Sequence, residues 1–161
     1  MVKITGVIYT ARDAAHKRML ENLHKGIALP VDLKDQTIYF AGPAPAKPNE
    51  PIGSVGPTTS YRMDAYSPET IELGLTCMIG KGARSKEVVD AMKKYGAVYI
   101  GAVGGAGALI SQCVKKCEVV DYADLGSEAI HRLEVVDFPG IVIIDSEGNN
   151  LYETEPPKYK K

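Results

Sequence analysis

Apolar and polar residues alternate at the start of the chain. In the segment VKITGVI, Val2, Ile4 and Ile8 recur at even spacing, the period that brings side chains to one face of a β-strand. Short apolar runs that end in glycine predict three more strands, at residues 33–42, 76–80 and 97–101. Near the C-terminus, the alternating segments HRLEVVDF and IVIIDSEGNNLYE predict strands joined by turns at Pro139-Gly140 and at residues 147–150.

Helices are predicted between these strands. After the first strand, Met19, Leu20 and Leu23 recur at helical spacing, with Thr10 placed to cap the helix and Gly26 to end it. Shorter helices are expected to begin at Ser67-Pro68, after Ser85, and near Ala106 or Gly107. Strands that alternate with helices are typical of an α/β fold.

The segment GSVGPTTSYRMDAY, residues 53–66, carries the strongest indication of a binding site. Pro57 suits the first position of a helix, which would leave the backbone N–H groups and hydroxyls of Thr58 and Thr59 at the positive helix end, where anions bind. Arg62 follows Thr58 by four residues and would share its helical face. Because a guanidinium binds a carboxylate or phosphate bidentately, we expect a small anion here.

A proline-rich loop leads into this segment. Residues 43–57 contain five prolines, and an irregular loop of about 14 residues in a compact domain is usually a binding segment or a lid. The loop is therefore predicted to take part in function.

Two further cations lie at junctions between a predicted strand and a predicted helix. Arg12 sits in the first helical turn, where a cation opposes the helix macrodipole unless it faces a bound anion. Lys81 directly follows the strand at residues 76–80. Such junctions commonly hold ligands at one edge of a sheet, so Arg12, Arg62 and Lys81 are expected to converge on a substrate with two carboxylates.

An ordinary interpretation of these cations stays open. In it they pair with neighbouring carboxylates in solvent, Arg62 with Asp64 or Glu69 and Arg12 with Asp13 or Glu21. His16 and His24 are expected to be solvated helix positions rather than catalytic bases. The glycine-rich segment at residues 101–109 lacks the GxGxxG order of a dinucleotide site. We interpret its glycines as points of close backbone approach, with a nucleotide cradle as the alternative.

Composition excludes several classes of function. The chain has 161 residues, enough for one sizeable core, and its net charge of −1 gives no electrostatic footprint for nucleic acid or an anionic membrane. No apolar run approaches the ~20 residues of a membrane span, and Met1 leads straight into a strand rather than a signal peptide. We expect a cytoplasmic protein with a small-molecule ligand, formed by one domain at residues 1–155 and a flexible tail at 156–161.

Three cysteines do not form a recognisable pattern. Cys77, Cys113 and Cys117 are odd in number and contain no CxxC pair, which argues against a disulfide framework. Cys113 and Cys117 could share a helix face, but neither the spacing nor a neighbouring histidine favours a metal site. The thiols are therefore predicted to be reduced.

Five motifs then carry a resemblance. They are TARDAAH at 10–16, IYFAGPAPA at 38–46, GPTTSYRMD at 56–64, MIGKG at 78–82 and GAVGGAGAL at 101–109. Together and in this order they resemble the beta subunit of the two-subunit iron-sulfur hydro-lyases, the family of class I fumarase and L-tartrate dehydratase, over nearly the whole chain. The resemblance implies an α/β fold, a single swivelling β/β/α domain with a mixed sheet.

The resemblance also implies an activity, which is the reversible hydration of fumarate to L-malate. It implies a hetero-oligomer with an alpha subunit, whose cysteines hold a 4Fe-4S cluster that this chain does not bind; without that partner the chain could form a homodimer. Arg12, Arg62, Lys81 and Thr59 correspond to substrate ligands. Thr58 corresponds to the catalytic residue that exchanges a substrate proton, activated by an aspartate of the alpha subunit, so the isolated chain is expected to be inactive.

The sequence departs from this pattern at one place. Fumarases of this type usually have alanine and glycine where this chain has Ser60 and Tyr61. Tyr61 either alters the pocket or faces outward, so L-tartrate or another 2-hydroxy diacid remains an alternative substrate. A non-enzymatic module that binds a dicarboxylate is the alternative of a different class, although such a module has no use for the proton-transfer hydroxyl of Thr58.

Overall fold

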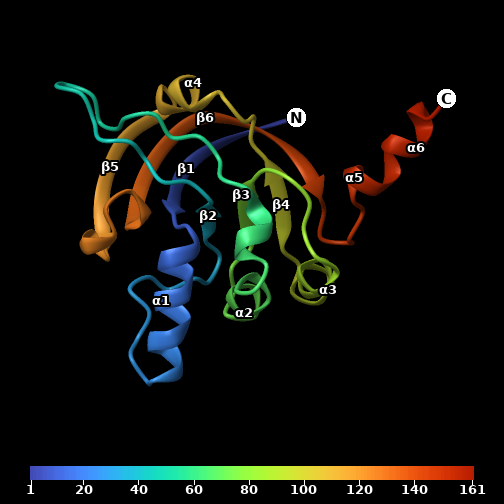
Figure 1. Cartoon of the computed structure of the whole chain (residues 1–161), viewed down its shortest axis with the longest axis horizontal. Coiled ribbons are helices and arrows are strands. Elements are labelled where there is room, and N and C mark those ends of the chain that lie inside the picture. Colours follow the sequence, from blue (N-terminus) through green and yellow to red (C-terminus); the bar gives the residue numbers. More distant parts are fainter.

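A mixed β-sheet that closes on itself organises the chain (Figure 1). The computed structural model describes residues 1–161. The strands are β1 (Val2–Thr10), β2 (Thr37–Tyr39), β3 (Cys77–Gly80), β4 (Val98–Gly101), β5 (Val114–Asp121) and β6 (Ile130–Ile144). The helices are α1 (Asp13–His24), α2 (Ser67–Glu72), α3 (Lys86–Tyr95), α4 (Gly107–Ser111), α5 (Leu151–Thr154) and α6 (Pro156–Tyr159), with 3-10 helices η1 (Ser60–Met63) and η2 (Ala123–Glu128).

The strands run in the order β1-β2-β3-β4-β6-β5, and a further pairing of β1 with β6 closes five of them into a ring. Neighbours among β1 to β4 are parallel, whereas β6 is antiparallel to β1, β4 and β5. The predicted α/β fold with a mixed sheet is confirmed. Because β1 to β4 are parallel, their carboxyl ends lie at one edge of the sheet.

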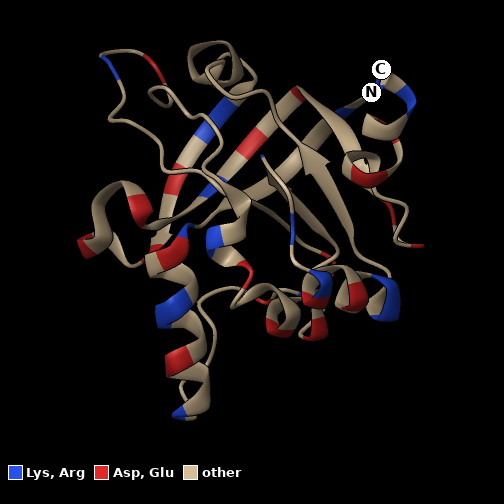
Figure 2. Cartoon of the chain, turned by 45° about the vertical axis from the view of Figure 1, so that its right-hand side comes forward, with Lys and Arg blue, Asp and Glu red and all other residues tan.

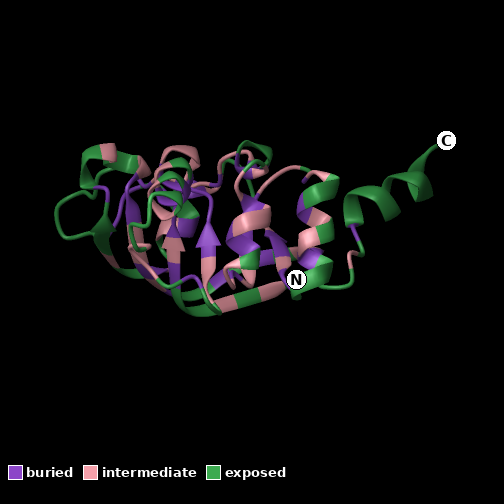
Figure 3. Cartoon of the chain, turned by 90° about the horizontal axis from the view of Figure 1, so that it is seen from below, coloured by how far each residue is buried: buried purple, intermediate pink, exposed green.

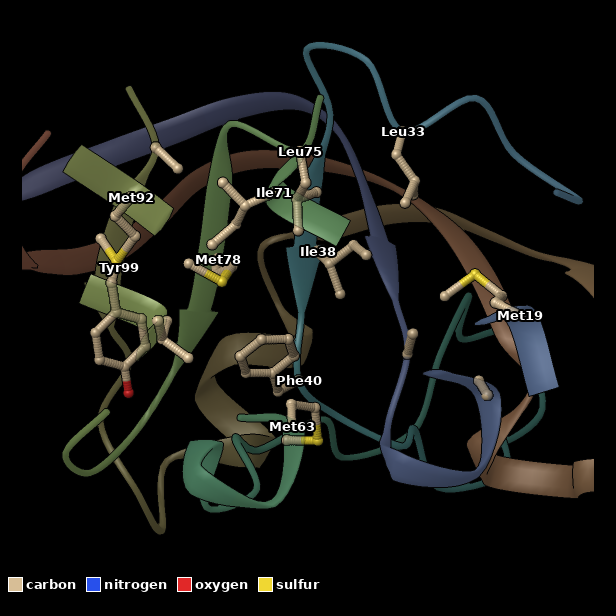
Figure 4. Packing of buried hydrophobic residues seen from close by; sticks show 14 of the residues in the cluster. Met19, Leu33, Ile38, Phe40, Met63, Ile71, Leu75, Met78, Met92 and Tyr99 are labelled. Carbon is tan, nitrogen blue, oxygen red and sulfur yellow. The ribbon is translucent and has the colours of Figure 1, made fainter. Parts of the chain in front are cut away.

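The chain has two hydrophobic cores, one on each side of this sheet. The first packs α1, α2 and α3 against the strands, and Figure 4 shows Phe40 at the end of β2 in contact with Met63 of η1. The second fills the inside of the ring and includes Tyr39, Ile79 and Phe138. Ile52 and Val55 of the proline-rich loop belong to the second core, so the loop is fixed by burial. Figure 3 shows buried residues along the strands and on the helix faces turned toward them.

Several predictions of element boundaries are wrong, and the strand predicted at residues 33–42 is confined to Thr37–Tyr39. Thr10 does not cap a helix: it is the last residue of β1, fully buried, and Arg12 holds the N-cap position without a side-chain cap. Pro139-Gly140 is not a turn, because β6 continues through it. Here β6 leaves β1 and meets β4, and a side chain at Gly140 would overlap Ile100; glycine is needed for this close approach.

Other expectations have mixed outcomes. The helix capped by Ser85 and ended by Gly96 is confirmed as α3, with Gly96 in the left-handed conformation. Cys117 lies in β5, so it and Cys113 do not share a helix face. Residues 156–159 form α6 and are exposed, and the flexibility expected for the tail stays a prediction. None of the helices has the length and apolar character that a membrane crossing requires.

Candidate active site

The predicted site residues lie at the sheet edge formed by the carboxyl ends of β1 to β4. Arg12 follows β1 and Lys81 follows β3. The segment that contains Thr58 enters between the extensions of β2 and β3, because Pro57 pairs with Ala41 and Thr59 pairs with Lys81 in isolated bridges. Thr58 N–H donates to the Phe40 carbonyl at 2.7 Å. The sheet thus brings Thr58, Thr59 and Lys81 together.

The local structure around Thr58 differs from the prediction. The helix begins at Ser60, not at Pro57, and η1 is a single 3-10 turn, so Thr58 and Arg62 do not share the face of an α-helix. The N–H groups of Thr58 and Ser60 bind the carbonyls of Phe40 and Lys81 and are not free to hold an anion. Sheet pairing outweighs helix propensity here because it satisfies these backbone donors. The Thr58 side chain, which is half-buried, is the group left for chemistry.

Arg62 lies in η1 and is exposed. The carboxylates that the ordinary interpretation assigned to it are bound elsewhere. Asp64 accepts a hydrogen bond from Arg84 Nε at 2.7 Å, and Glu69 lies 2.6 Å from His24 Nε2. The ion pairs proposed for Arg62 are therefore not formed.

Lys81 is half-buried and its backbone is held on both sides. Its carbonyl accepts from Ser60 N–H at 2.9 Å, and its N–H donates to Ser60 Oγ at 3.0 Å. The lysine side chain runs along Gly104, where an added Cβ would lie 3.4 Å from Lys81 Cδ and 3.5 Å from Nζ. The glycine-rich segment after β4 therefore leaves room for the ammonium group.

Arg12 is also half-buried, with 27% of its side chain exposed. Its Nε lies 3.6 Å from Glu128 Oε1 and 3.9 Å from Asp13 Oδ1. These contacts are ionic but too long for hydrogen bonds. Of the partners in the ordinary interpretation, Asp13 is near, whereas Glu21 lies 3.9 Å from Lys17 Nζ and belongs to a different pair. Positive and negative residues are interspersed along the elements of the chain (Figure 2).

A buried network behind the site connects η1 with the segment after β3. The Tyr99 hydroxyl lies 2.8 Å from both Ser60 Oγ and the Gly82 carbonyl, and burial raises the pKa of Tyr99 to about 12. The Arg84 side chain is fully buried between the rings of Phe40 and Tyr99. Burial lowers the pKa of Arg84, while its ion pair with Asp64 opposes this effect. The sequence analysis did not predict this network, because no local sequence pattern indicates a buried arginine.

The two unusual residues of the threonine motif face opposite ways. Ser60 is fully buried and takes part in the network, whereas Tyr61 is 65% exposed. Of the two alternatives for Tyr61, the structure therefore shows the outward one.

His16 contradicts the prediction of a solvated position, because it is fully buried. Its Nδ1 lies 2.8 Å from the Arg12 carbonyl, and its ring packs against Phe40 and Tyr66. Burial lowers the pKa of His16 to about 4, so the ring is neutral and Nδ1–H donates to Arg12. The signal was present in the sequence, since His16 precedes Met19 and Leu20 at helical spacing on the buried face.

The glycine-rich segment and the cysteines have structural surroundings. Close approach is confirmed at Gly107, where an added Cβ would lie 2.5 Å from Ser54 Oγ. Burial raises the pKa of Cys77 to about 11, unlike that of a metal-binding thiolate. No group of three or more histidine, cysteine, aspartate or glutamate side chains is arranged to hold a metal ion. This chain's residues therefore do not fit an iron-sulfur cluster.

The largest groove, of about 740 Å³, lies away from the cations, between residues 44–54 and the α4–β5 region. Its charged lining residues are Lys47, Lys115 and Glu50, and it contains none of the predicted site residues. Thr58, Arg62 and Lys81 lie instead at the open edge of the sheet.

Comparison with known proteins adds to this geometry. The family model described as Fumarase C-terminus matches residues 1–155. Fumarate hydratase 1, mitochondrial, of Leishmania major is 43% identical over 158 residues, which cover 94% of this chain and 28% of that protein. Fumarate hydratase class I, aerobic, of Escherichia coli is 41% identical over 154 residues, with 94% and 28% covered.

A shorter relative matches over most of its own length. It is a protein of Methanocaldococcus jannaschii provisionally named L(+)-tartrate dehydratase subunit beta, 43% identical over 159 residues that cover 95% of this chain and 82% of the relative. The chain spans only about 28% of the length of the fumarate hydratases it matches. The chain belongs to the Fumarase C-terminus family, the domain shared by class I fumarate hydratases and the tartrate dehydratase beta subunit.

Proposed function

We propose that this chain is the beta subunit of an iron-sulfur hydro-lyase that reversibly hydrates fumarate to L-malate. The observation that carries the proposal is the placement of Thr58 between the extensions of β2 and β3, with Lys81 paired to Thr59 and Arg12 at the same edge of the sheet. A proton-transfer hydroxyl and several cations at one edge suit a dicarboxylate substrate better than a structural role.

The chemistry assigns different tasks to these side chains. Removing a proton next to a carboxylate builds negative charge on that carboxylate, so fixed cations lower the barrier when they face the developing charge. Arg12, Arg62 and Lys81 are the proposed cations, and Thr59 is proposed to bind the substrate beside them. Thr58 is the proposed proton carrier. Because a threonine hydroxyl is a weak base, it needs an acceptor next to it, which we assign to the partner.

The partner is proposed to be an alpha subunit that carries a 4Fe-4S cluster. Two observations support a shared site. The cations lie at an open sheet edge rather than inside the largest groove of this chain, and the relatives named fumarate hydratase are more than three times longer than the matched region. The cluster, when bound, supplies a Lewis acid for the substrate hydroxyl. Hetero-oligomer formation and the cytoplasmic location remain predictions.

A second substrate has an observation in its favour. A relative of which this chain covers 82% carries the name of a tartrate dehydratase subunit. L-tartrate has a carboxylate at each end, as malate does, so the same cations can bind it. Ser60 does not discriminate between the two, because it is buried behind the site.

Reconstitution tests the proposal. The chain is mixed anaerobically with the cluster-bearing alpha subunit, and hydration of fumarate and dehydration of L-tartrate are followed separately. We expect the mixture to hydrate fumarate while neither subunit alone does so. If the assembled pair with an intact cluster converts only tartrate, the fumarate assignment is wrong. If it converts neither while the isolated chain binds dicarboxylates saturably, the chain is a non-enzymatic binding module.

A further inference from the structure

Three of the four buried side-chain polar atoms without a hydrogen-bond partner lie together, at Arg12 Nε. They are Arg12 Nε itself, Asp13 Oδ1 and Glu128 Oε1, and the fourth is His16 Nε2. Arg12 and Asp13 lie at the start of α1, and Glu128 comes from the end of η2, more than a hundred residues later. Unpaired buried polar atoms cost folding free energy and are rare in native proteins. Asp13 Oδ1 and Glu128 Oε1 both face Arg12 Nε, at 3.9 Å and 3.6 Å, so Arg12 is the centre of this cluster.

The Arg12 side chain is confined by an ionic contact and by packing against its stem. Its Nε lies 3.6 Å from Glu128 Oε1, and this Nε is buried, so the exposed part of the side chain consists of other atoms. Gly42 lies against the stem: a Cβ added there would be 3.1 Å from Arg12 Cδ and 2.9 Å from the Ser127 carbonyl. The segment that ends in Glu128 therefore packs against Gly42 and the arginine stem together.

Arg18, another arginine of this chain, is neutralised by a carboxylate that binds both of its terminal nitrogens. Arg18 binds Asp124 through both terminal nitrogens, with Nη1–Oδ1 at 2.7 Å and Nη2–Oδ2 at 2.8 Å. Glu128 instead approaches Arg12 at Nε, at a longer distance. A guanidinium whose Nε faces a carboxylate keeps its two Nη groups, which can form a bidentate fork for a second carboxylate.

We propose that Glu128 is a positioning residue for Arg12, fixing the plane of the guanidinium so that its Nη groups present a fork to one substrate carboxylate. Asp13 flanks the same Nε. The role rests on the proposed function, because Arg12 is a substrate ligand only there. The proposal has a cost, since a carboxylate near Arg12 weakens the attraction of the site for anions. The gain from orientation must exceed that loss.

The loss of the charge and the loss of orientation change KM in opposite directions, so the direction of the change distinguishes them. Glu128→Gln removes the charge and keeps the shape. If Glu128 acted only as a background charge, the variant would bind a dicarboxylate more tightly and KM would fall. If Glu128 positions Arg12, the variant loses the orientation of the fork. We then expect KM to rise about tenfold, because displacing a binding group by about 1 Å can reduce activity by about a hundredfold. Glu128→Asp keeps the charge and should restore part of the loss.

The matched control is Glu118→Gln on β5, which removes a carboxylate 3.4 Å from Arg132 Nη1 of β6. The first readout is the arginine Nε–H signal of the ¹⁵N-labelled chain, with Arg12→Lys used to assign the Arg12 signal. We expect Glu128→Gln to shift or broaden that signal and Glu118→Gln to leave it unchanged. The second readout is KM for fumarate in the mixture with the alpha subunit, and thermal unfolding of each variant confirms folding.

The outcomes separate this proposal from the proposed function. An Arg12 signal that does not respond to Glu128→Gln overturns the positioning role, and so does an unchanged or lower KM. An inactive wild-type mixture overturns the hydro-lyase function and with it the purpose of the fork, while the Nε–H signal still decides whether Glu128 holds Arg12. If Arg12→Lys leaves KM unchanged, Arg12 is not a substrate ligand and the positioning role fails.

Discussion

Ser60 and Lys81 are joined by two hydrogen bonds that run in opposite directions. Ser60 N–H donates to the Lys81 carbonyl at 2.9 Å, and Lys81 N–H donates to Ser60 Oγ at 3.0 Å. This pair connects the segment of Thr58 to the end of β3. A side chain at Gly80 would overlap Ser60 Oγ, so the close fit of the two segments depends on a glycine there.

Ser60→Ala removes one half of this connection and the contact with the Tyr99 hydroxyl. The Lys81 N–H then loses its partner in a partly buried place, which costs about 1–2 kcal/mol of unfolding free energy. Urea denaturation measures this loss. Ser146→Ala, at an exposed turn, serves as control and should change little; equal effects of both substitutions would contradict the structural role of Ser60.

Arg84→Met breaks the buried pair with Asp64 and leaves that carboxylate with the Ser85 N–H but without a positive charge beside it. Breaking one side of a buried ion pair typically costs about 3–5 kcal/mol, and we expect a loss of this size in chemical denaturation. Arg18→Met breaks a pair with Asp124 at the surface and should have a much smaller effect. A stable Arg84→Met variant would show that the network does not hold η1 to the segment after β3.

Gly42→Ala introduces a Cβ 2.9 Å from the Ser127 carbonyl and 3.1 Å from Arg12 Cδ. Because the backbone carbonyl cannot yield easily, Arg12 is displaced, and KM for the dicarboxylate should rise about tenfold or more. Gly56→Ala is the matched control, since its Cβ would meet Gly107 Cα at an ordinary 3.6 Å. Steady-state kinetics of the reconstituted pair compare the two; similar KM values would argue against Arg12 as a substrate ligand.

His16 makes the stability of the chain depend on pH. Burial is the main cause that lowers its pKa from 6.5 to about 4; the hydrogen bond to the Arg12 carbonyl opposes this effect, the charge of Arg84 adds to it, and Asp13 opposes it. Below pH 6.5 the unfolded chain therefore binds a proton at His16 that the folded chain does not bind. The contribution of His16 to the free energy of unfolding is complete above pH 6.5 and is lost as the pH falls toward 4. At ~1.4 kcal/mol per pH unit the loss totals about 3 kcal/mol.

Denaturation of wild type and His16→Gln between pH 7 and pH 4 measures this contribution as a difference. The variant should lack the part of the pH dependence that His16 supplies. His24→Gln, at an exposed position beside Glu69, is the control and should follow the wild-type curve. Parallel curves for wild type and His16→Gln would contradict the burial of a neutral histidine.

The sequence predicted those parts of the fold that depend on local chemistry. The apolar periodicity of α1 and the Ser85 cap and Gly96 end of α3 identified helices correctly. The Pro139-Gly140 turn failed because its cause is not local: Gly140 is required by the approach of Ile100 from β4. Thr58 failed as a helix residue for the same reason, since its N–H is bound by Phe40 of a distant strand end.

The candidate site was predicted in part. Strand ends in sequence order located Arg12 and Lys81 at one sheet edge, because parallel strands put such positions together. The contact of Glu128 with Arg12 could not be predicted from the sequence, because it depends on how η2 packs against the start of α1. His16 was within reach, because its spacing matches the buried stripe, but histidine was assumed to face solvent.

Thr58 carries the central claim, and Thr58→Ala tests it most directly. Fumarate hydration is measured for the reconstituted pair with wild type, Thr58→Ala and the control Thr154→Ala, which lies on the exposed α5. Proton transfer by a positioned group contributes about 10²–10⁴-fold, so kcat should fall by that factor in Thr58→Ala with KM nearly unchanged, while Thr154→Ala keeps full activity. A Thr58→Ala pair that hydrates fumarate at close to the wild-type rate would contradict the account.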